Sequence, residues 1–258
     1  MLNFRTIRIT LLLGVLAVAG FLTAHQFIYS RNWTKPLEAV IYPINADGHL
    51  ATESYIESLE DETFKPIDRW LVREAARHDL DLTVPVNFRL GEQIRSHPPE
   101  FPIDGNAVDV LAWGLKFRWW AFRNTSEETR NLTRIRLFVM YHHGNDGSPL
   151  THSLGMQKGL MGLVHAFALP EQNAQNNIVI AHEMLHTVGA IDKYESNGAP
   201  MFPVGYANPA RTPLFPQRSA EIMAGRIPTS HQSYYMAESL KSVVINGYTA
   251  AEINWLSE

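Results

Sequence analysis

The sequence predicts an α+β protein in which a mixed sheet and several helices follow one apolar helix at the N-terminus. Two periodicities support this prediction. Apolar residues alternate with period two in some stretches and recur every three or four residues in others. The 258-residue chain is 45% hydrophobic and 19% charged, which is an ordinary globular composition. This length suits one large domain or two small ones.

The N-terminal segment is apolar enough to be an export signal. Residues 9–24 carry no charge, and Arg5 and Arg8 precede them, which orients the N-terminus toward the cytoplasm. We expect residues 1–31 to form a signal peptide or a signal anchor, and we favour the anchor. The remaining chain then lies on the outer (periplasmic or extracellular) face of a membrane, or is secreted if the segment is cleaved.

Charge and cysteine content exclude several functions. Without Arg5, Arg8 and Arg31, the formal charge of −4 becomes −7. A nucleic-acid partner is therefore not expected, because such proteins present a basic surface. The chain contains no cysteine, so disulfides and zinc–thiolate ligation are both excluded.

Four stretches have the pattern of β-strands. The first three alternate or end at turn residues, and the fourth is mostly apolar with His165 in its middle. These stretches are residues 37–44, 84–90, 135–141 and 160–169.

Helical periodicity marks three other regions. Residues 55–79 form the first, which we expect to break at Pro66 because proline suits a first helical turn. Residues 108–119 form the second, with Asp104 or Asn106 as its N-cap. The third is a C-terminal helix over residues 248–256, with Ile253 and Leu256 facing inward. The second helix is rich in aromatic residues, for which core packing is favoured over substrate binding. They are Trp113, Phe117, Trp119, Trp120 and Phe122.

A fourth helix carries the chemistry. Residues 182–186 read His-Glu-Met-Leu-His, after an apolar stretch that Asn176 or Asn177 is expected to cap. On a helix the two histidines lie on one face, one turn apart, which is the spacing at which two imidazoles bind one zinc ion. Glu183 lies beside them and is free to handle a proton. Gly189 follows and can end the helix in a left-handed conformation.

This motif resembles that of the metzincin group of zinc peptidases, whose pattern is H-E-x-x-H-x-x-G-x-x-H. His182, Glu183, His186 and Gly189 match, and Asp192 stands at the third ligand position, as in the snapalysin type. The resemblance implies a zincin-like twisted mixed sheet with an active-site helix and a small irregular or helical C-terminal subdomain. Residues 32–258 would be the metallopeptidase domain, divided into an upper subdomain (about 32–189) and a lower one (about 190–258).

The resemblance also implies an activity. One catalytic Zn²⁺ ion would be held by His182, His186 and Asp192, above Met223 as an apolar floor. The protein would be an endopeptidase acting on peptide or protein substrates, in which Glu183 takes a proton from a zinc-activated water and passes it to the leaving amine. The strand over residues 160–169 would be the edge strand that binds substrate. Further candidates for binding the oxyanion or substrate are Tyr206, His231, Tyr234, Tyr235 and His165.

Two alternatives stay open at this point. Glu221 or Glu195 could replace Asp192 as the third ligand. The chain could also be a membrane-anchored zinc-binding module without catalysis, which would need the histidines but not Glu183. The presence of Glu183 favours the enzyme.

Overall fold

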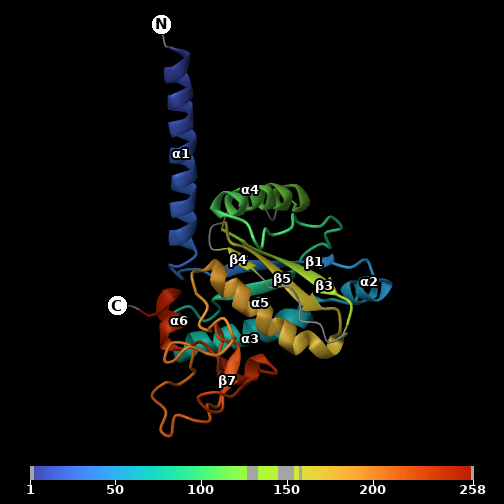
Figure 1. The fold of residues 1–258 in the computed structure, drawn as a ribbon, viewed down its shortest axis with the longest axis vertical. Coiled ribbons are helices and arrows are strands. Elements are labelled where there is room, and N and C mark those ends of the chain that lie inside the picture. Colours follow the sequence, from blue (N-terminus) through green and yellow to red (C-terminus); the bar gives the residue numbers. More distant parts are fainter. Residues whose placement is uncertain (1–2, 127–132, 145–153, 157–158, 257–258) are drawn as a thin grey trace.

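The computed structural model describes residues 3–126, 133–144, 154–156 and 159–256. These residues form a mixed α/β fold with a five-stranded sheet and six α-helices (Figure 1). The strand order is β2-β1-β3-β5-β4. The first four strands in this order are parallel, and β4 pairs antiparallel with β5. The strands are β1 (Leu37–Asn45), β2 (Val86–Leu90), β3 (Ile135–His142), β4 (Leu154–Met156) and β5 (Met161–Phe167).

All four predicted strands are present, but the predicted edge strand was assigned wrongly. The stretch over residues 160–169 becomes β5, which lies between β3 and β4. The edge strand is β4, whose three residues are too few to show an alternating pattern. It pairs with β5 through Gly155 and Gly162. Any substrate that adds to this edge of the sheet would therefore pair with β4.

The first helical region is divided at a different place from the one predicted. It forms α2 (Leu50–Glu57) and α3 (Asp61–Arg77), and Pro66 lies inside α3. The break falls at residues 58–60. Glu60 is the N-cap of α3 and forms a capping box with Thr63, so this cap starts the helix and the proline does not.

Helices cover both faces of the sheet (Figure 1). On one face lie α3 and α5 (Asn173–Thr187), whose apolar side chains share a core with Ile41, Leu137 and Val164. On the other face lies α4 (Ala107–Asn124), packed on Tyr42 and Phe138. Such burial on both faces is expected for parallel strands.

The aromatic residues of α4 are only partly in the core. Trp113 and Phe117 are buried as predicted, while Trp119 and Phe122 are exposed. The prediction of core packing is therefore wrong for these last two residues. Of the two predicted caps, Asn106 is the one that α4 uses, and its side chain accepts hydrogen bonds from the backbone N–H groups of Val108 and Asp109.

The chain after α5 is largely irregular, with short paired strands. Its elements are β6 (Ala220–Glu221), β7 (Arg226–Pro228), β8 (Tyr234–Met236), β9 (Val243–Val244) and α6 (Gly247–Glu252). The last helix is shorter than predicted; Ile253 is buried, but Leu256 is exposed. One buried cluster joins residues from both sides of position 189, so this segment packs directly beneath α3 and α5.

The N-terminal segment is a single helix, α1 (Phe4–Tyr29), that projects from the rest of the molecule (Figure 1). Its most apolar window has a mean hydropathy of 2.1, and none of that window is buried. Length and composition therefore fit a membrane anchor or a signal sequence. Its C-terminal end is attached to the body, because Trp33 is buried and donates its indole N–H to the Ile253 carbonyl at 2.6 Å.

Candidate metal centre

Helix α5 positions the motif through one buried face. Ile180, Ala181, Met184 and Leu185 are fully buried against the sheet, at helical spacing. The predicted caps lie inside the helix, which begins at Asn173. Asn176 instead hydrogen-bonds the backbone N–H and carbonyl of Phe167 on β5, and Asn177 bonds the Thr63 carbonyl on α3. These two side chains therefore fix α5 against its neighbours.

The chain reverses direction directly after the motif. Gly189 has φ +113°, the left-handed conformation expected from the sequence. Its N–H donates to the His186 carbonyl at 3.2 Å, and the Ala190 N–H donates to the Leu185 carbonyl at 3.1 Å. A residue with a Cβ would be strained here. The turn brings Asp192 back beside the two histidines.

Three side-chain atoms converge at this point. The Nε2 atoms of His182 and His186 lie 3.1 Å apart, and Asp192 Oδ1 lies 3.1 Å from the first and 3.2 Å from the second. Among the described residues, they are the group whose geometry suits a metal ion. The structure thus brings together the three residues that the sequence proposed as ligands.

Backbone carbonyls orient both imidazoles. His182 Nδ1 lies 3.0 Å from the Ile222 carbonyl oxygen, and His186 Nδ1 lies 2.8 Å from that of Ala190. A carbonyl only accepts hydrogen bonds, so we assign a proton to each Nδ1. In the neutral tautomers both Nε2 lone pairs then point at the shared space, which is the arrangement that metal-binding histidines use.

This donor set fits zinc. Zinc accepts imidazole nitrogen and carboxylate oxygen at about 2.0–2.1 Å, and a tetrahedral ion with such bonds separates its ligands by about 3.3–3.4 Å. The three observed separations of 3.1–3.2 Å are close to these ligand–ligand distances. Three protein ligands also leave one tetrahedral position open, as catalytic sites do.

The three atoms also require a positive charge between them. Burial disfavours the charged form of His182, but hydrogen bonding to Asp192 and the charge of Glu183 outweigh this and raise its pKa to about 9. Desolvation likewise opposes ionisation of Asp192, yet hydrogen bonds from His182 and His186 hold its pKa well below the usual range. In the metal-free protein a proton therefore neutralises part of the repulsion among these acceptors.

Glu183 lies beside the group without joining it. The side chain is buried, and its Oε2 atom has no hydrogen-bond partner among the described residues. Burial raises the pKa of this carboxyl, while the two histidines oppose the rise. A buried carboxylate oxygen without a partner is costly to maintain, which makes a structural role a poor explanation for it.

The segment that carries Met223, the predicted floor of the site, contacts both parts of the centre. It consists of β6 and a turn that Gly225 closes with φ +68°. The Ile222 carbonyl binds His182, while the carbonyl of the buried Met223 accepts from the Lys193 N–H at 3.0 Å. The turn therefore links the first histidine to the residue that follows Asp192.

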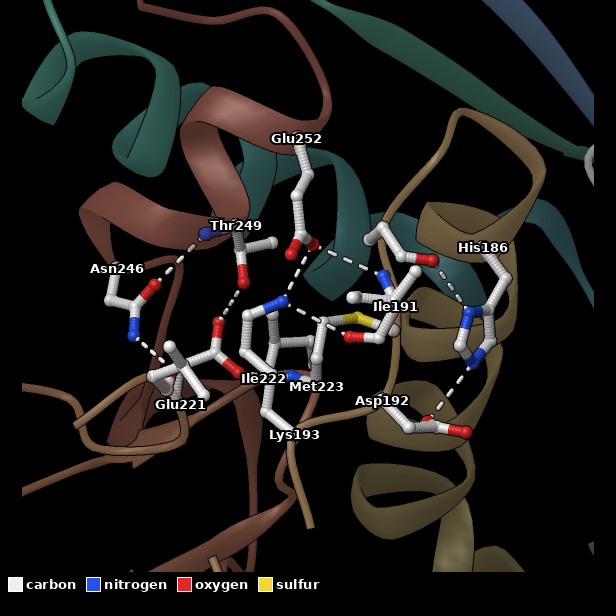
Figure 2. Close-up of polar contacts among 12 residues, drawn as sticks. His186, Ile191, Asp192, Lys193, Glu221, Ile222, Met223, Asn246, Thr249 and Glu252 are labelled. Carbon is white, nitrogen blue, oxygen red and sulfur yellow. Dashed lines mark hydrogen bonds and ion pairs between the residues drawn. The ribbon is translucent and has the colours of Figure 1, made fainter. Parts of the chain in front are cut away.

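Glu221, the alternative third ligand, is occupied elsewhere. Its two carboxylate oxygens accept hydrogen bonds from the Met223 N–H and the Thr249 hydroxyl, each at 2.6 Å (Figure 2). Burial raises its pKa to about 7. Glu195, the other alternative, is exposed in a turn closed by Gly198. The geometry thus favours Asp192.

A buried lysine fixes the backbone next to Asp192, the proposed third ligand. Lys193 is 1% exposed, and its Nζ donates to Glu252 Oε2 at 2.6 Å and to the Ile191 carbonyl at 3.1 Å (Figure 2). The same Glu252 oxygen accepts the Ile191 N–H at 3.1 Å. Helix α6 therefore holds the residues on both sides of Asp192.

The other predicted side chains make their contacts away from this group. His165 lies on the α4 face of the sheet, because it alternates along β5 with Val164 and Ala166 of the core beneath α5. It pairs there with His142, with 2.9 Å between ring nitrogens, and burial lowers its pKa to about 4. This position separates His165 from the candidate centre by the sheet itself.

The predicted donors of the C-terminal part are also engaged elsewhere. The Tyr206 ring packs on Phe202 and Phe215, and the His231 ring meets the edge of Phe215. The Tyr234 hydroxyl donates to the Asn197 carbonyl at 3.0 Å. Tyr235 is exposed on β8.

Two residues at the centre were not anticipated. Tyr194 interacts with the Asp192 carboxylate, and desolvation together with the Asp192 charge raises the pKa of its phenol to about 12. Gly155 of β4 packs on α5 so closely that a Cβ would lie 2.4 Å from that of His186. Its backbone N–H lies near the Glu183 carboxyl and opposes the rise of its pKa. Tyr194 could have been found from the sequence, because it lies two residues after Asp192. No feature of the sequence pointed to Gly155.

Comparisons with known proteins add little to this picture. No protein-family model and no curated protein matches the sequence. One solved structure, described as that of a chaperone–substrate complex, aligns with a TM-score of 0.43 and 13% sequence identity. The alignment covers 85% of this chain and 33% of that chain, so this chain spans one third of the other's length. Similarity at this level carries no inference about function.

Proposed function

We propose that this protein is a zinc-dependent endopeptidase of zincin-like fold. The observation that carries the proposal is the buried, unpartnered Oε2 of Glu183 beside three convergent ligand atoms. The arrangement of a motif helix beneath an antiparallel edge strand supports the same class. Fold alone does not determine function, so the proposal depends on the site.

The residues divide the chemistry between them. His182, His186 and Asp192 would hold the ion, which when bound supplies a Lewis acid and lowers the pKa of water. Glu183 accepts the proton of the attacking water and returns it to the leaving amine. Burial raises the pKa of this carboxyl, which favours its uptake of the proton. The Tyr194 hydroxyl, beside Asp192, is the best placed donor for the oxyanion.

The test separates zinc binding from hydrolysis. The full chain, purified in detergent, is expected to contain about one zinc per molecule and to cleave a peptide library until a chelator is added. Glu183→Gln keeps the shape of the side chain, and we expect it to retain zinc and lose cleavage. Glu57→Gln, at an exposed position on α2, is the matched control and should keep both. Cleavage by Glu183→Gln at the wild-type rate contradicts the mechanism.

The choice of third ligand has its own test. Asp192→Asn should weaken zinc binding by at least about tenfold, because it removes a charged ligand. Glu221→Gln should leave zinc affinity nearly unchanged, since both of its oxygens are bound to Met223 and Thr249. The opposite ranking would assign the ligand to Glu221.

The competing function is a membrane-anchored zinc module without catalysis. It predicts stoichiometric zinc, no cleavage of any peptide, and no role for Glu183 beyond stability. The close contact of Glu183 with Gly155 at the sheet edge favours the enzyme, because a substrate strand added to β4 would pass beside this carboxylate.

A further inference from the structure

Helix α4 is apolar on two opposite faces. Its inner face packs Trp113, Phe117 and Ala121 on the sheet. A second row of apolar side chains faces solvent and is here called the outer stripe. The outer stripe consists of Val108, Leu111, Leu115, Trp119 and Phe122, which are between 48% and 72% exposed.

The spacing makes the outer stripe continuous. Its members are separated by three or four residues, so they fall on one side of the helix, about half a turn from the buried face. A single exposed apolar residue is ordinary on a protein surface. Five on one helix, with Ile103 80% exposed just before it, form a patch of the kind that marks an interaction surface.

Cationic residues border the outer stripe. On a helical projection Lys116 and Arg123 fall along one flank and Arg118 along the other. The Arg118 guanidinium is half-buried and donates through Nη1 to the Gly114 carbonyl at 2.9 Å, so its charge lies close to the helix. An apolar face of Leu, Trp and Phe with Lys and Arg at its margins is the composition of helices that lie in a membrane interface. Their long side chains place the charge at the headgroup level.

The position of α1 indicates which surface covers the outer stripe. In Figure 1, α4 lies at the end of the globular part from which α1 projects, and its axis runs across that of α1. The base of α1 is fixed to the body, because Ser30 and Trp33 are buried and Asn254 donates to the Arg31 carbonyl at 2.8 Å. A bilayer crossed by α1 would therefore meet α4.

We propose that α4 lies in the headgroup–acyl boundary of the leaflet next to the globular part, with its outer stripe inserted into lipid. The depth expected for such a helix is about 5–10 Å. The occupant is the bilayer itself, favoured by the location of α4 at the end of the globular part from which the apolar α1 projects and by the attraction of anionic lipid to the cationic flanks. A second copy of the chain is disfavoured, because face-to-face α4 helices would bring these like charges together.

This interface would set the orientation of the candidate centre. Helix α5 and the ligand atoms lie on the sheet face opposite α4. The centre would therefore be directed away from the membrane, held at a fixed height above it. The proposal does not depend on zinc or on peptidase activity, so each can fail without the other.

The absence of cysteine makes the test direct. Single cysteines are introduced by Leu111→Cys and Leu115→Cys on the outer stripe and by Glu57→Cys on the distant α2. Each full-length variant carries a nitroxide label and is reconstituted in phosphatidylcholine–phosphatidylglycerol vesicles. Because α1 is present in all of them, membrane attachment is equal. We expect oxygen to reach the labels at positions 111 and 115 far better than a water-soluble nickel complex does, and the reverse at position 57.

Two results would overturn the proposal. One is water-like accessibility at positions 111 and 115. The other is broadening between labels of neighbouring molecules that increases with the protein-to-lipid ratio, which would identify a second copy as the occupant. A second measurement needs no label: bromine-substituted lipid should quench the fluorescence of Trp119, and the quenched component should be lost in Trp119→Phe. Equal quenching of both proteins contradicts insertion.

Discussion

The buried amine of Lys193 lies 2.6 Å from the Glu252 carboxylate, and this ion pair joins the third ligand of the candidate centre to the C-terminal helix. The Asp192 side chain is partly exposed, so core packing does not fix its position. The backbone on both sides of it is held by the same pair, through the Ile191 carbonyl and N–H. Asp192, the proposed third ligand, is therefore positioned by a residue 60 positions away in the sequence.

Breaking this pair should loosen the metal centre. In Lys193→Met the apolar stem is retained but Glu252 loses its partner, so we expect zinc affinity to fall about tenfold or more. The free energy of unfolding should fall by about 2 kcal/mol, less than for a fully buried pair because Glu252 is partly exposed. Competition with a chelator and denaturant unfolding measure the two effects. Lys241→Met, at an exposed lysine, is the matched control. An unchanged zinc affinity in Lys193→Met would show that the pair does not position Asp192.

Zinc binding should be coupled to the loss of a proton from His182. The pKa of this imidazole is raised to about 9 in the metal-free fold, so at pH 7 a proton occupies the site that the ion needs. Zinc affinity should therefore rise with pH, by about tenfold per unit below pH 9, and level off above it. Calorimetry in buffers of different ionisation enthalpy counts the protons released. Release of none at pH 7 would refute the coupling.

The same pKa gives a stability prediction of opposite slope for the metal-free protein. The folded-state pKa of His182 lies above its ordinary value of 6.5, so the contribution of its proton to the free energy of unfolding is fully present below pH 6.5. That contribution is lost as pH rises through 9. Asp192→Asn removes the main group that raises the pKa, so the decline should shrink in this variant. A decline of equal size in both proteins would assign it to other groups.

The sequence predicted the helix of the centre because its signals are local. Two histidines one turn apart, a buried face at helical spacing, and Gly189 at the turn all lie within one segment, and each has a direct physical meaning. The return of Asp192 also follows from local geometry, because the left-handed glycine reverses the chain. The orientation of the His182 imidazole does not, since it depends on the Ile222 carbonyl 40 residues further on.

The features that escaped prediction depend on contacts between distant segments. β4 has three residues, and its role as edge strand arises from pairing with β5. Asn176 does not cap the helix, because its side chain hydrogen-bonds the backbone of Phe167 on β5, a segment whose packing on the helix the local sequence does not show. Exposure of Trp119 could not be read from composition, because both faces of α4 are apolar and the sheet covers one.

Tyr194 should matter for the transition state and little for substrate binding. Its hydroxyl interacts with Asp192, and in the proposed mechanism negative charge on the substrate oxygen would develop beside this residue. In Tyr194→Phe we expect kcat to fall about 10²–10³-fold, as for loss of one oxyanion donor, with KM changed much less. Tyr234→Phe is the comparison, since its hydroxyl binds the Asn197 carbonyl, and it should keep near-normal kcat. Steady-state kinetics on one library-derived peptide provide both values. A fall in kcat confined to Tyr234→Phe would move the oxyanion donor to β8.

A methyl group at position 155 should disrupt the edge of the sheet and the centre together. In Gly155→Ala the new Cβ would meet the His186 Cβ at 2.4 Å and the Glu183 carbonyl oxygen at 2.7 Å, and neither can yield without moving α5. We expect a loss of about 1–3 kcal/mol in the free energy of unfolding, typical of overpacking, and weaker zinc binding as His186 shifts. The matched control is Gly247→Ala, where nothing lies within 4 Å of the added methyl. That change should be neutral or slightly stabilising, because alanine favours the start of α6 more than glycine does. Equal unfolding curves for the two variants would mean that β4 does not pack on α5 in solution.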